Sequence, residues 1–146
     1  MADRLIELPD ETATIRLAGE VAGSLQAGDV IALDGPLGAG KTTFARALVA
    51  ALGGDPGLVA SPTFTLLHRY DARLPVIHVD AYRLRSPGEL RGLGFDELRD
   101  EAVAVVEWAE RVAEVLTPTW SIRLDHAASA GGRVATVCQG RRILNV

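Results

Sequence analysis

The sequence predicts an α/β fold of three layers, with a largely parallel central sheet and antiparallel strands at its edges. Three observations support this prediction. Residues 29–34 carry a continuous apolar run of strand length, which is typical of a strand buried on both faces. Strand-like runs alternate with helical patterns along the chain, the order that builds parallel sheets. The tail alternates apolar and polar residues around Gly131 and Gly132, which indicates an antiparallel hairpin at a sheet edge.

The first half of the chain predicts two strand–helix units. Residues 4–8 indicate a short strand, and Asp10 is the expected N-cap of the helix that follows, because its carboxylate can accept a hydrogen bond from the first turn. Apolar residues at helical spacing continue this helix until Gly28. After the strand at 29–34 and a glycine-rich loop, a second amphipathic helix is expected.

The second half predicts shorter elements. Strands are expected at 64–70 and 76–80. Ser86 and Glu89 have the layout of a capping box and begin an expected helix over 86–98, although two glycines interrupt it. A buried strand, a further helix and the hairpin complete the chain, with expected ranges 102–106, 109–116 and 120–137.

Length and composition indicate one globular domain over residues 1–146, because the chain is 48% hydrophobic and 23% charged. The formal net charge of −4 argues against a broad basic surface for RNA or DNA. The single cysteine, Cys138, excludes an intramolecular disulfide and fits a reducing compartment. The first residues do not resemble a signal peptide, and no apolar stretch approaches the about 20 residues of a membrane helix. A cytoplasmic protein without membrane contact is expected.

Residues 35–42 match the G-x-x-x-x-G-K-[ST] pattern of a phosphate-binding loop, and they specify the fold class as P-loop NTPase-like. A strand leads into the loop and a helix leaves it, so backbone N–H groups and the helix N-terminus can surround phosphates. Lys41 is expected at the β- and γ-phosphates, the Thr42 hydroxyl on Mg²⁺, and Thr43 near the α-phosphate. The motif therefore predicts ATP and Mg²⁺ as ligands. The expected nucleotide-binding residues are Gly35, Pro36, Leu37, Gly38, Ala39, Gly40, Lys41, Thr42 and Thr43.

Lys41 is the only lysine among 15 cationic residues. Arginine replaces lysine well as a solvated surface charge, but not where a slim ammonium must fit between phosphates. The alternative interpretation is a glycine-rich turn in which the Gly-Lys-Thr sequence is incidental. The flanking strand and helix favour the phosphate-binding loop.

Two expected strands end in carboxylates, Asp80 and Glu107. Because the carboxyl ends of parallel strands meet at one sheet edge, both side chains are expected near the γ-phosphate, where Mg²⁺ requires oxygen ligands. Each could instead be a solvated loop residue. His78 shares a strand face with Asp80 and is expected to be packed and hydrogen-bonded rather than catalytic. Trp108 is either a core residue or an exposed contact.

Residues 61–65, with the sequence Ser-Pro-Thr-Phe-Thr, lie between the P-loop helix and the next strand. Nucleotide switches often place a threonine there that senses Mg²⁺ and the γ-phosphate. Thr63 is therefore a candidate catalytic residue. A capped turn is the alternative.

Taken in order, these motifs resemble the TsaE (YjeE) ATPases of bacterial tRNA threonylcarbamoyladenosine synthesis, over most of the chain. The motifs are GPLGAGKTTF at 35–44, SPTFTL at 61–66, HVDAYRL at 78–84 and EW at 107–108. A P-loop is common to many families, but this combination is highly specific. Pro36 stands where the family usually has aspartate, which stiffens the loop entrance. Looser matches at the two ends make Thr12 and Arg133 expected neighbours of the nucleotide.

The resemblance implies that Lys41 and Thr42 bind phosphate and Mg²⁺, that Glu107 is the second contact to the metal, and that Asp80 and Thr63 act at the γ-phosphate or the water. It also implies a partner, the TsaB–TsaD pair, which transfers a threonylcarbamoyl group onto an adenosine beside the tRNA anticodon. ATP hydrolysis would let that assembly turn over. The tRNA would sit mainly on the partners, which agrees with the acidic charge of this chain.

Two other functions stay open at this point. A small-molecule phosphotransferase of the nucleoside-kinase type shares the P-loop but needs an arginine-bearing lid. No insertion is long enough for such a lid, although Arg83 and Arg85 could stand in for its arginines. A nucleotide-gated binding module with incidental hydrolysis is the second. The separate roles of Asp80 and Glu107 also stay open.

Overall fold

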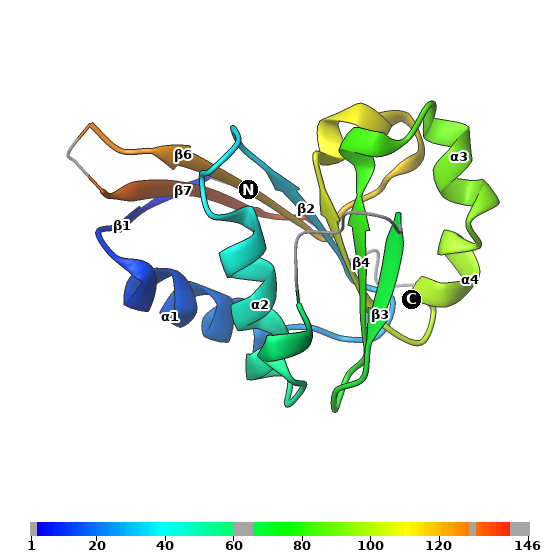
Figure 1. Ribbon diagram of the computed structural model, residues 1–146, viewed down its shortest axis with the longest axis horizontal. Coiled ribbons are helices and arrows are strands. Elements are labelled where there is room, and N and C mark those ends of the chain that lie inside the picture. Colours follow the sequence, from blue (N-terminus) through cyan, green and yellow to red (C-terminus); the bar gives the residue numbers. More distant parts are fainter. Residues whose placement is uncertain (1–2, 60–65, 129–130, 141–146) are drawn as a thin grey trace.

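A computed structural model describes residues 3–59, 66–128 and 131–140. Through this part of the chain runs a seven-stranded sheet in the order β1-β7-β6-β2-β5-β4-β3 (Figure 1). Its strands are β1 Arg4–Leu8, β2 Val30–Asp34, β3 Leu67–Tyr70, β4 Val76–Asp80, β5 Val103–Glu107, β6 Trp120–His126 and β7 Arg133–Gln139. Strands β6, β2, β5 and β4 pair in parallel, whereas β7, β1 and β3 pair antiparallel. The predicted sheet is confirmed.

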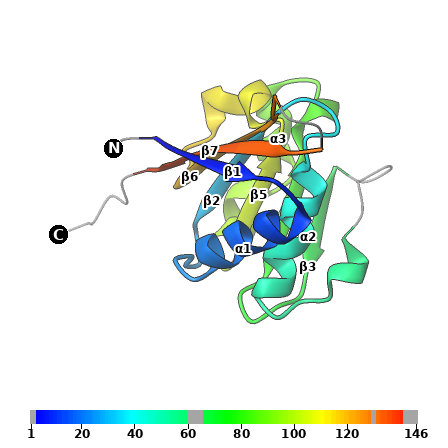
Figure 2. The same ribbon diagram turned by 90° about the vertical axis from the view of Figure 1, so that its left-hand side faces the viewer.

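Helices cover both faces of the sheet. Helices α1 and α2 lie on one face and α3 and α4 on the other (Figures 1 and 2). The helices are α1 Glu11–Ala22, α2 Lys41–Ala51, α3 Pro87–Gly92 and α4 Phe95–Arg99, with 3-10 turns η1 Pro56–Leu58, η2 Ala81–Arg83 and η3 Ala109–Val115. Successive residues of β2 alternate between two cores, because Ile31 and Leu33 pack toward α1 and α2 while Val30 and Ala32 pack toward α3 and α4. The predicted three layers are therefore present.

Local signals placed some helix ends correctly and others not. Asp10 caps α1, because its Oδ1 accepts a hydrogen bond from Ala13 N at 3.0 Å. The single helix expected over 86–98 is wrong: Gly94, at φ 81°, separates α3 from α4. The expected capping box is also absent, since Glu89 Oε2 accepts from Arg85 N and the Ser86 side chain makes no cap bond. The helix expected over 109–116 is the kinked 3-10 segment η3.

The C-terminal hairpin of β6 and β7 is present but does not form the sheet edge. Strand β1 pairs with β7, with Leu5 opposite Thr136, so the first strand of the chain is the outermost one. At the other edge, β3 begins at Leu67, and residues 64 and 65 of the expected strand lie outside the described residues. Within the described ranges, no helix combines the length and hydropathy required to cross a membrane.

Candidate functional site

The phosphate-loop sequence joins the central strand β2 to the start of α2, as its flanking patterns predict. Gly35 has φ 144°, and a Cβ built on it would collide with the backbone oxygen of Leu124 in β6. Gly40, at φ 102°, is the N-cap residue of α2 and has no side chain to cap the helix. The N–H groups of the first turn of α2 are therefore directed at the loop, which favours an anionic ligand.

Lys41 lies with its ammonium inside the loop and is only 6% exposed. Its Nζ donates to the carbonyl oxygens of Gly35 at 2.5 Å and of Pro36 at 3.1 Å. Because an ammonium has three protons, one remains for a further acceptor. Burial lowers the pKa of Lys41 from its usual value, against the opposing effect of the Glu107 carboxylate. The loop thus holds one desolvated positive charge.

Trp108 forms the wall beside this lysine. The centroid of its ring lies 4.2 Å from Lys41 Nζ, within the range of a cation–π contact. The backbone of Trp108 has a φ of 57°, a left-handed conformation that is costly for a residue with a large side chain. The backbone N–H of Trp108 donates to Leu33 O at 3.0 Å. Tyr82 packs on the ring at 5.1 Å, and Arg111 lies 5.0 Å from the Tyr82 ring. Trp108 is therefore a half-buried site residue that bridges core and surface.

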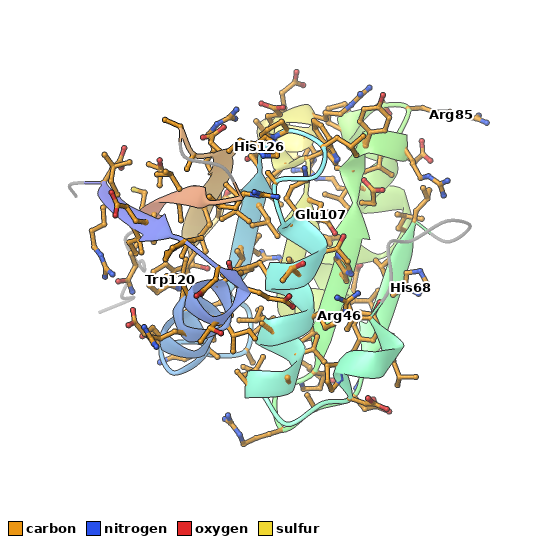
Figure 3. The ribbon with its side chains drawn as sticks, turned by 60° about the vertical axis from the view of Figure 1, so that its left-hand side comes forward. Arg46, His68, Arg85, Glu107, Trp120 and His126 are labelled. Atoms are coloured by element: carbon orange, nitrogen blue, oxygen red, sulfur yellow. The ribbon has the colours of Figure 1, made fainter. Side chains whose placement is uncertain are left out.

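The two strand-end carboxylates lie side by side, because Asp80 of β4 is the register partner of Glu107 of β5. Asp80 Oδ1 accepts a hydrogen bond from Tyr82 N at 3.1 Å. The pKa of Asp80 is raised, first by partial burial and also by the charge of Glu107. Glu107 is buried, projects beside the first turn of α2 and contacts His78 (Figure 3). Both acids thus face the P-loop side of the sheet.

One cavity of about 490 Å³ collects these groups. It is bounded by the loop, the first turn of α2 and the ends of β4 and β5. Its lining residues are Leu37, Gly38, Gly40, Lys41, Thr42, Thr43, Asp80, Tyr82, Glu107 and Trp108. Hydroxyl and carboxylate oxygens are the donors that Mg²⁺ takes, so Thr42, Asp80 and Glu107 fit a magnesium ion at one side of this cavity.

A second, smaller hollow of about 200 Å³ shares Gly40 and Thr43 with the first. Arg133 lines it and donates from Nη2 to Gly38 O at 3.1 Å, which ties β7 to the phosphate loop. Thr12 is exposed on α1 and does not line the hollow, whereas Thr14 does. A shift of two residues turns a helical side chain by about 200°, which explains the difference.

A model of the family "Threonylcarbamoyl adenosine biosynthesis protein TsaE" matches residues 8–135. The chain belongs to the TsaE family. It is 41% identical over 112 residues to the TsaE of Rickettsia conorii, with 76% of this chain and 64% of that protein covered. It is 38% identical over 145 residues to the TsaE of Mycobacterium bovis, covering 92% and 86%. Both relatives are named tRNA threonylcarbamoyladenosine biosynthesis proteins.

The structure is similar to the crystal structure of YdiB from Bacillus subtilis, with a TM-score of 0.74 and 30% sequence identity over 95% of this chain and 87% of that one. This similarity and the family match confirm the P-loop-like fold and indicate nucleotide binding. The predicted family is confirmed as well.

In this TsaE-family chain, eight of the predicted site residues line the main cavity: Leu37, Gly38, Gly40, Lys41, Thr42, Thr43, Asp80 and Glu107. Gly40 and Thr43 line the second hollow as well. Gly35 and Pro36 act from outside the main cavity as acceptors for Lys41, and Ala39 lines the second hollow. Thr63 lies outside the described residues.

Two residues beside the site were given no role at the nucleotide by the sequence. Tyr82 belongs to the HVDAYRL motif and was a candidate contact for the partner, but its packing on Trp108 was not predicted, because it depends on η2 turning back after β4. Asp34 ends β2, and its Oδ1 accepts from Glu110 N at 3.1 Å, so it anchors η3 beside the loop. Burial raises the pKa of Asp34. The position of Asp34 directly before Gly35 was the sequence feature that could have indicated its place beside the loop.

Proposed function

We propose that residues 1–146 form one P-loop ATPase domain that hydrolyses Mg·ATP and so supports turnover of the TsaB–TsaD pair, which forms threonylcarbamoyladenosine in tRNA. The observation that carries the proposal is the meeting of Lys41, Thr42, Asp80 and Glu107 in one cavity at a helix N-terminus. These are the groups that nucleotide hydrolysis requires: a phosphate-binding cation, a metal-binding hydroxyl and acids for metal and water. The TsaE family match names the pathway.

Phosphate binding is assigned to the loop and Lys41. The two carbonyls that hold Lys41 Nζ fix its position at the loop centre, and its remaining proton is available to a β- or γ-phosphate oxygen. The first-turn N–H groups of α2 add further donors. The hollow beside Arg133 adjoins the same loop and is proposed to take the nucleoside. Thr12 is exposed and does not line this hollow, so the hollow does not support the predicted place of Thr12.

Magnesium is assigned to Thr42 as a direct ligand and to Glu107 either directly or through a water. When bound, the ion neutralises charge on the phosphates during transfer. Asp80 is then assigned to the γ-phosphate or the attacking water, and Thr63 keeps the same predicted role. The partly buried position of Asp80, which raises its pKa, suits a group that accepts a hydrogen bond from water.

The phosphotransferase alternative needs arginines that act in place of those of a lid, and the structure gives it little support. Arg85 is exposed and points away from the cavity (Figure 3). The cavity lining includes only one cationic side chain among the described residues, that of Lys41. A nucleotide-gated binding module would have the same site and differs only in needing no hydrolysis.

Single-turnover and steady-state measurements of ATP consumption test the proposal. Wild-type protein should release ADP and phosphate in equal amounts, only with Mg²⁺, and Lys41→Ala should abolish this. Phosphate transfer to added nucleosides in place of release to water would support the phosphotransferase. Nucleotide-dependent binding to TsaB–TsaD that is unchanged in a variant unable to hydrolyse ATP, with tRNA modification intact, would support the binding module.

A further inference from the structure

His78 and Glu107 form a buried contact that the proposed function does not use. His78 lies on β4, is 1% exposed, and has its Nε2 2.5 Å from Glu107 Oε2. Glu107 is opposite Asp80 in the sheet, and His78 is two residues before Asp80, so the histidine reaches the carboxylate diagonally across neighbouring strands. The contact is therefore fixed by backbone register rather than by a flexible loop.

The proton on the His78 ring can be assigned from its surroundings. Nδ1 is buried and has no hydrogen-bond partner among the described residues. A buried N–H without an acceptor is more costly than a buried nitrogen lone pair, because the donor loses its bond to water. The neutral ring therefore carries its proton on Nε2, where it donates to Glu107 Oε2.

This bond restrains a side chain that would otherwise rotate. Glu107 comes from β5, whose other residues are buried aliphatics, and its carboxylate reaches the cavity that Thr42 also lines. With Oε2 held by His78, rotation of the carboxylate is restrained and Oε1 is the oxygen left for another ligand. Partners of this kind orient metal-binding carboxylates in proteins generally.

We propose that His78 is a positioning residue that orients the Glu107 carboxylate for Mg²⁺. The inference rests on the proposed function of Glu107 as a magnesium contact and adds the residue that makes this contact effective. Loss of an orienting partner typically lowers metal affinity about 10–100-fold. His78 itself touches neither the metal nor the nucleotide.

Two polar replacements separate positioning from packing. In His78→Gln the amide extends about as far as Nε2 and can still donate to Glu107, whereas in His78→Asn it ends near the position of Nδ1. Ile77→Val on the same strand is a matched control, because Ile77 is fully buried but packs in the opposite core. Thermal melting of all variants establishes that they are folded at the assay temperature.

The measurement is the affinity for a fluorescent ATP analogue, titrated in EDTA and at increasing Mg²⁺. In His78→Asn, the Mg²⁺ concentration that gives half of the maximal increase in affinity for the analogue should rise about 10–100-fold. The affinity for the analogue in EDTA should not change. His78→Gln should recover most of the wild-type response, and Ile77→Val should equal wild type. Equal loss of affinity with and without Mg²⁺ in His78→Asn, or no recovery in His78→Gln, would overturn the inference.

Glu107→Gln separates this inference from the proposed function. If Glu107→Gln leaves the Mg²⁺ response unchanged, the assignment of Glu107 to the metal fails. If Glu107→Gln weakens the response and His78→Asn does not, only the positioning role fails. If Glu107→Gln and His78→Asn each weaken the Mg²⁺ response, the double variant that carries both substitutions should respond like Glu107→Gln alone, because His78 acts through that carboxylate.

Discussion

The ammonium of Lys41 lies between two backbone carbonyls and the face of Trp108, 2.5 Å from Gly35 O and 4.2 Å from the ring centroid. Its pKa is lowered, chiefly by burial. A lysine whose folded-state pKa lies below its usual value of 10.5 holds its proton less well in the folded protein than in the unfolded chain. The charge therefore costs stability below the folded-state pKa, and this cost is relieved as the pH rises toward 10.5.

Lys41→Met is expected to abolish ATP turnover without lowering the melting temperature at neutral pH. Methionine keeps much of the aliphatic volume and removes the desolvated charge. Relief of that burial cost offsets the loss of the two hydrogen bonds and of the contact with the Trp108 ring. Turnover should fall at least about 100-fold, because the site loses the cation that contacts the phosphates. Phosphate release and thermal melting of the same preparation check both parts. A melting temperature well below wild type would show that Lys41 supports the fold.

Gly35→Ala should weaken nucleotide binding and lower stability. The new Cβ would collide with Leu124 O, and alanine is strained at φ 144°, so the loop must shift away from β6. We expect a loss of roughly 2–3 kcal/mol in the free energy of unfolding. Gly19→Ala in α1 is the matched control, because nothing lies within 4 Å of its Cβ position. This substitution should raise the free energy of unfolding by about 0.5–1 kcal/mol. Urea denaturation distinguishes these outcomes.

Much of the site was predictable because its signals are local. A buried strand, a glycine loop and a helix in immediate succession leave little freedom in how residues 35–42 fold. The meeting of Asp80 and Glu107 was also predictable, because both end strands of a parallel sheet and such ends share an edge. Neither prediction required knowledge of distant contacts.

The differences from the prediction lie where the local sequence pattern does not determine the structure. Nothing near residues 4–8 indicates that β1 pairs with β7 and takes the sheet edge. The helix expected over 86–98 divides because Gly94 is left-handed, a choice that a glycine permits but does not require. The packing of α1 on α2 decides which face of α1 is turned to the loop. As a result Thr14, and not Thr12, lines the second hollow.

Asp80→Asn should stabilise the protein at neutral pH while reducing ATP hydrolysis. The pKa of Asp80 is raised above 3.8, chiefly by burial, so its ionised form is less favourable in the folded protein. This cost is absent below pH 3.8, develops as the pH rises from 3.8 to the folded-state pKa and is complete above that pKa. The variant should melt at a higher temperature than wild type at pH 7.5, and the difference should disappear toward pH 4. Hydrolysis should fall about 100-fold or more.

Asp34→Asn is the control for this effect. Its pKa is also raised by burial, and an asparagine Oδ1 can still accept the hydrogen bond from Glu110 N. It does not line the main cavity, so it should gain stability with the same pH dependence and retain hydrolysis. Equal loss of hydrolysis in both variants would show that the effect of Asp80 is not specific to the γ-phosphate or water.

The isolated protein is expected to be a slow ATPase that the TsaB–TsaD pair accelerates. Hydrolysis needs a positive charge placed beside the γ-phosphoryl group, as well as a metal ion and an oriented water. Among the described residues that line the cavity, Lys41 is the only cation. Arg46 donates to Val59 O, and Arg133 reaches the loop from the side of the second hollow. An arginine from a partner can raise such rates by about 10³–10⁵.

The test is steady-state phosphate release with and without the TsaB–TsaD pair from the same organism, together with gel filtration of the mixture. We expect a low rate alone, at least a tenfold rise with the pair, and a complex that elutes earlier than its components. Asp80→Ala and Glu107→Ala should abolish the stimulated rate and threonylcarbamoyladenosine formation in the reconstituted system. The exposed Tyr82 and its neighbour Trp108 lie at the cavity mouth, where a partner could reach the γ-phosphate. Fast hydrolysis by the isolated chain, unchanged by the pair and without a complex, would contradict the proposed mechanism.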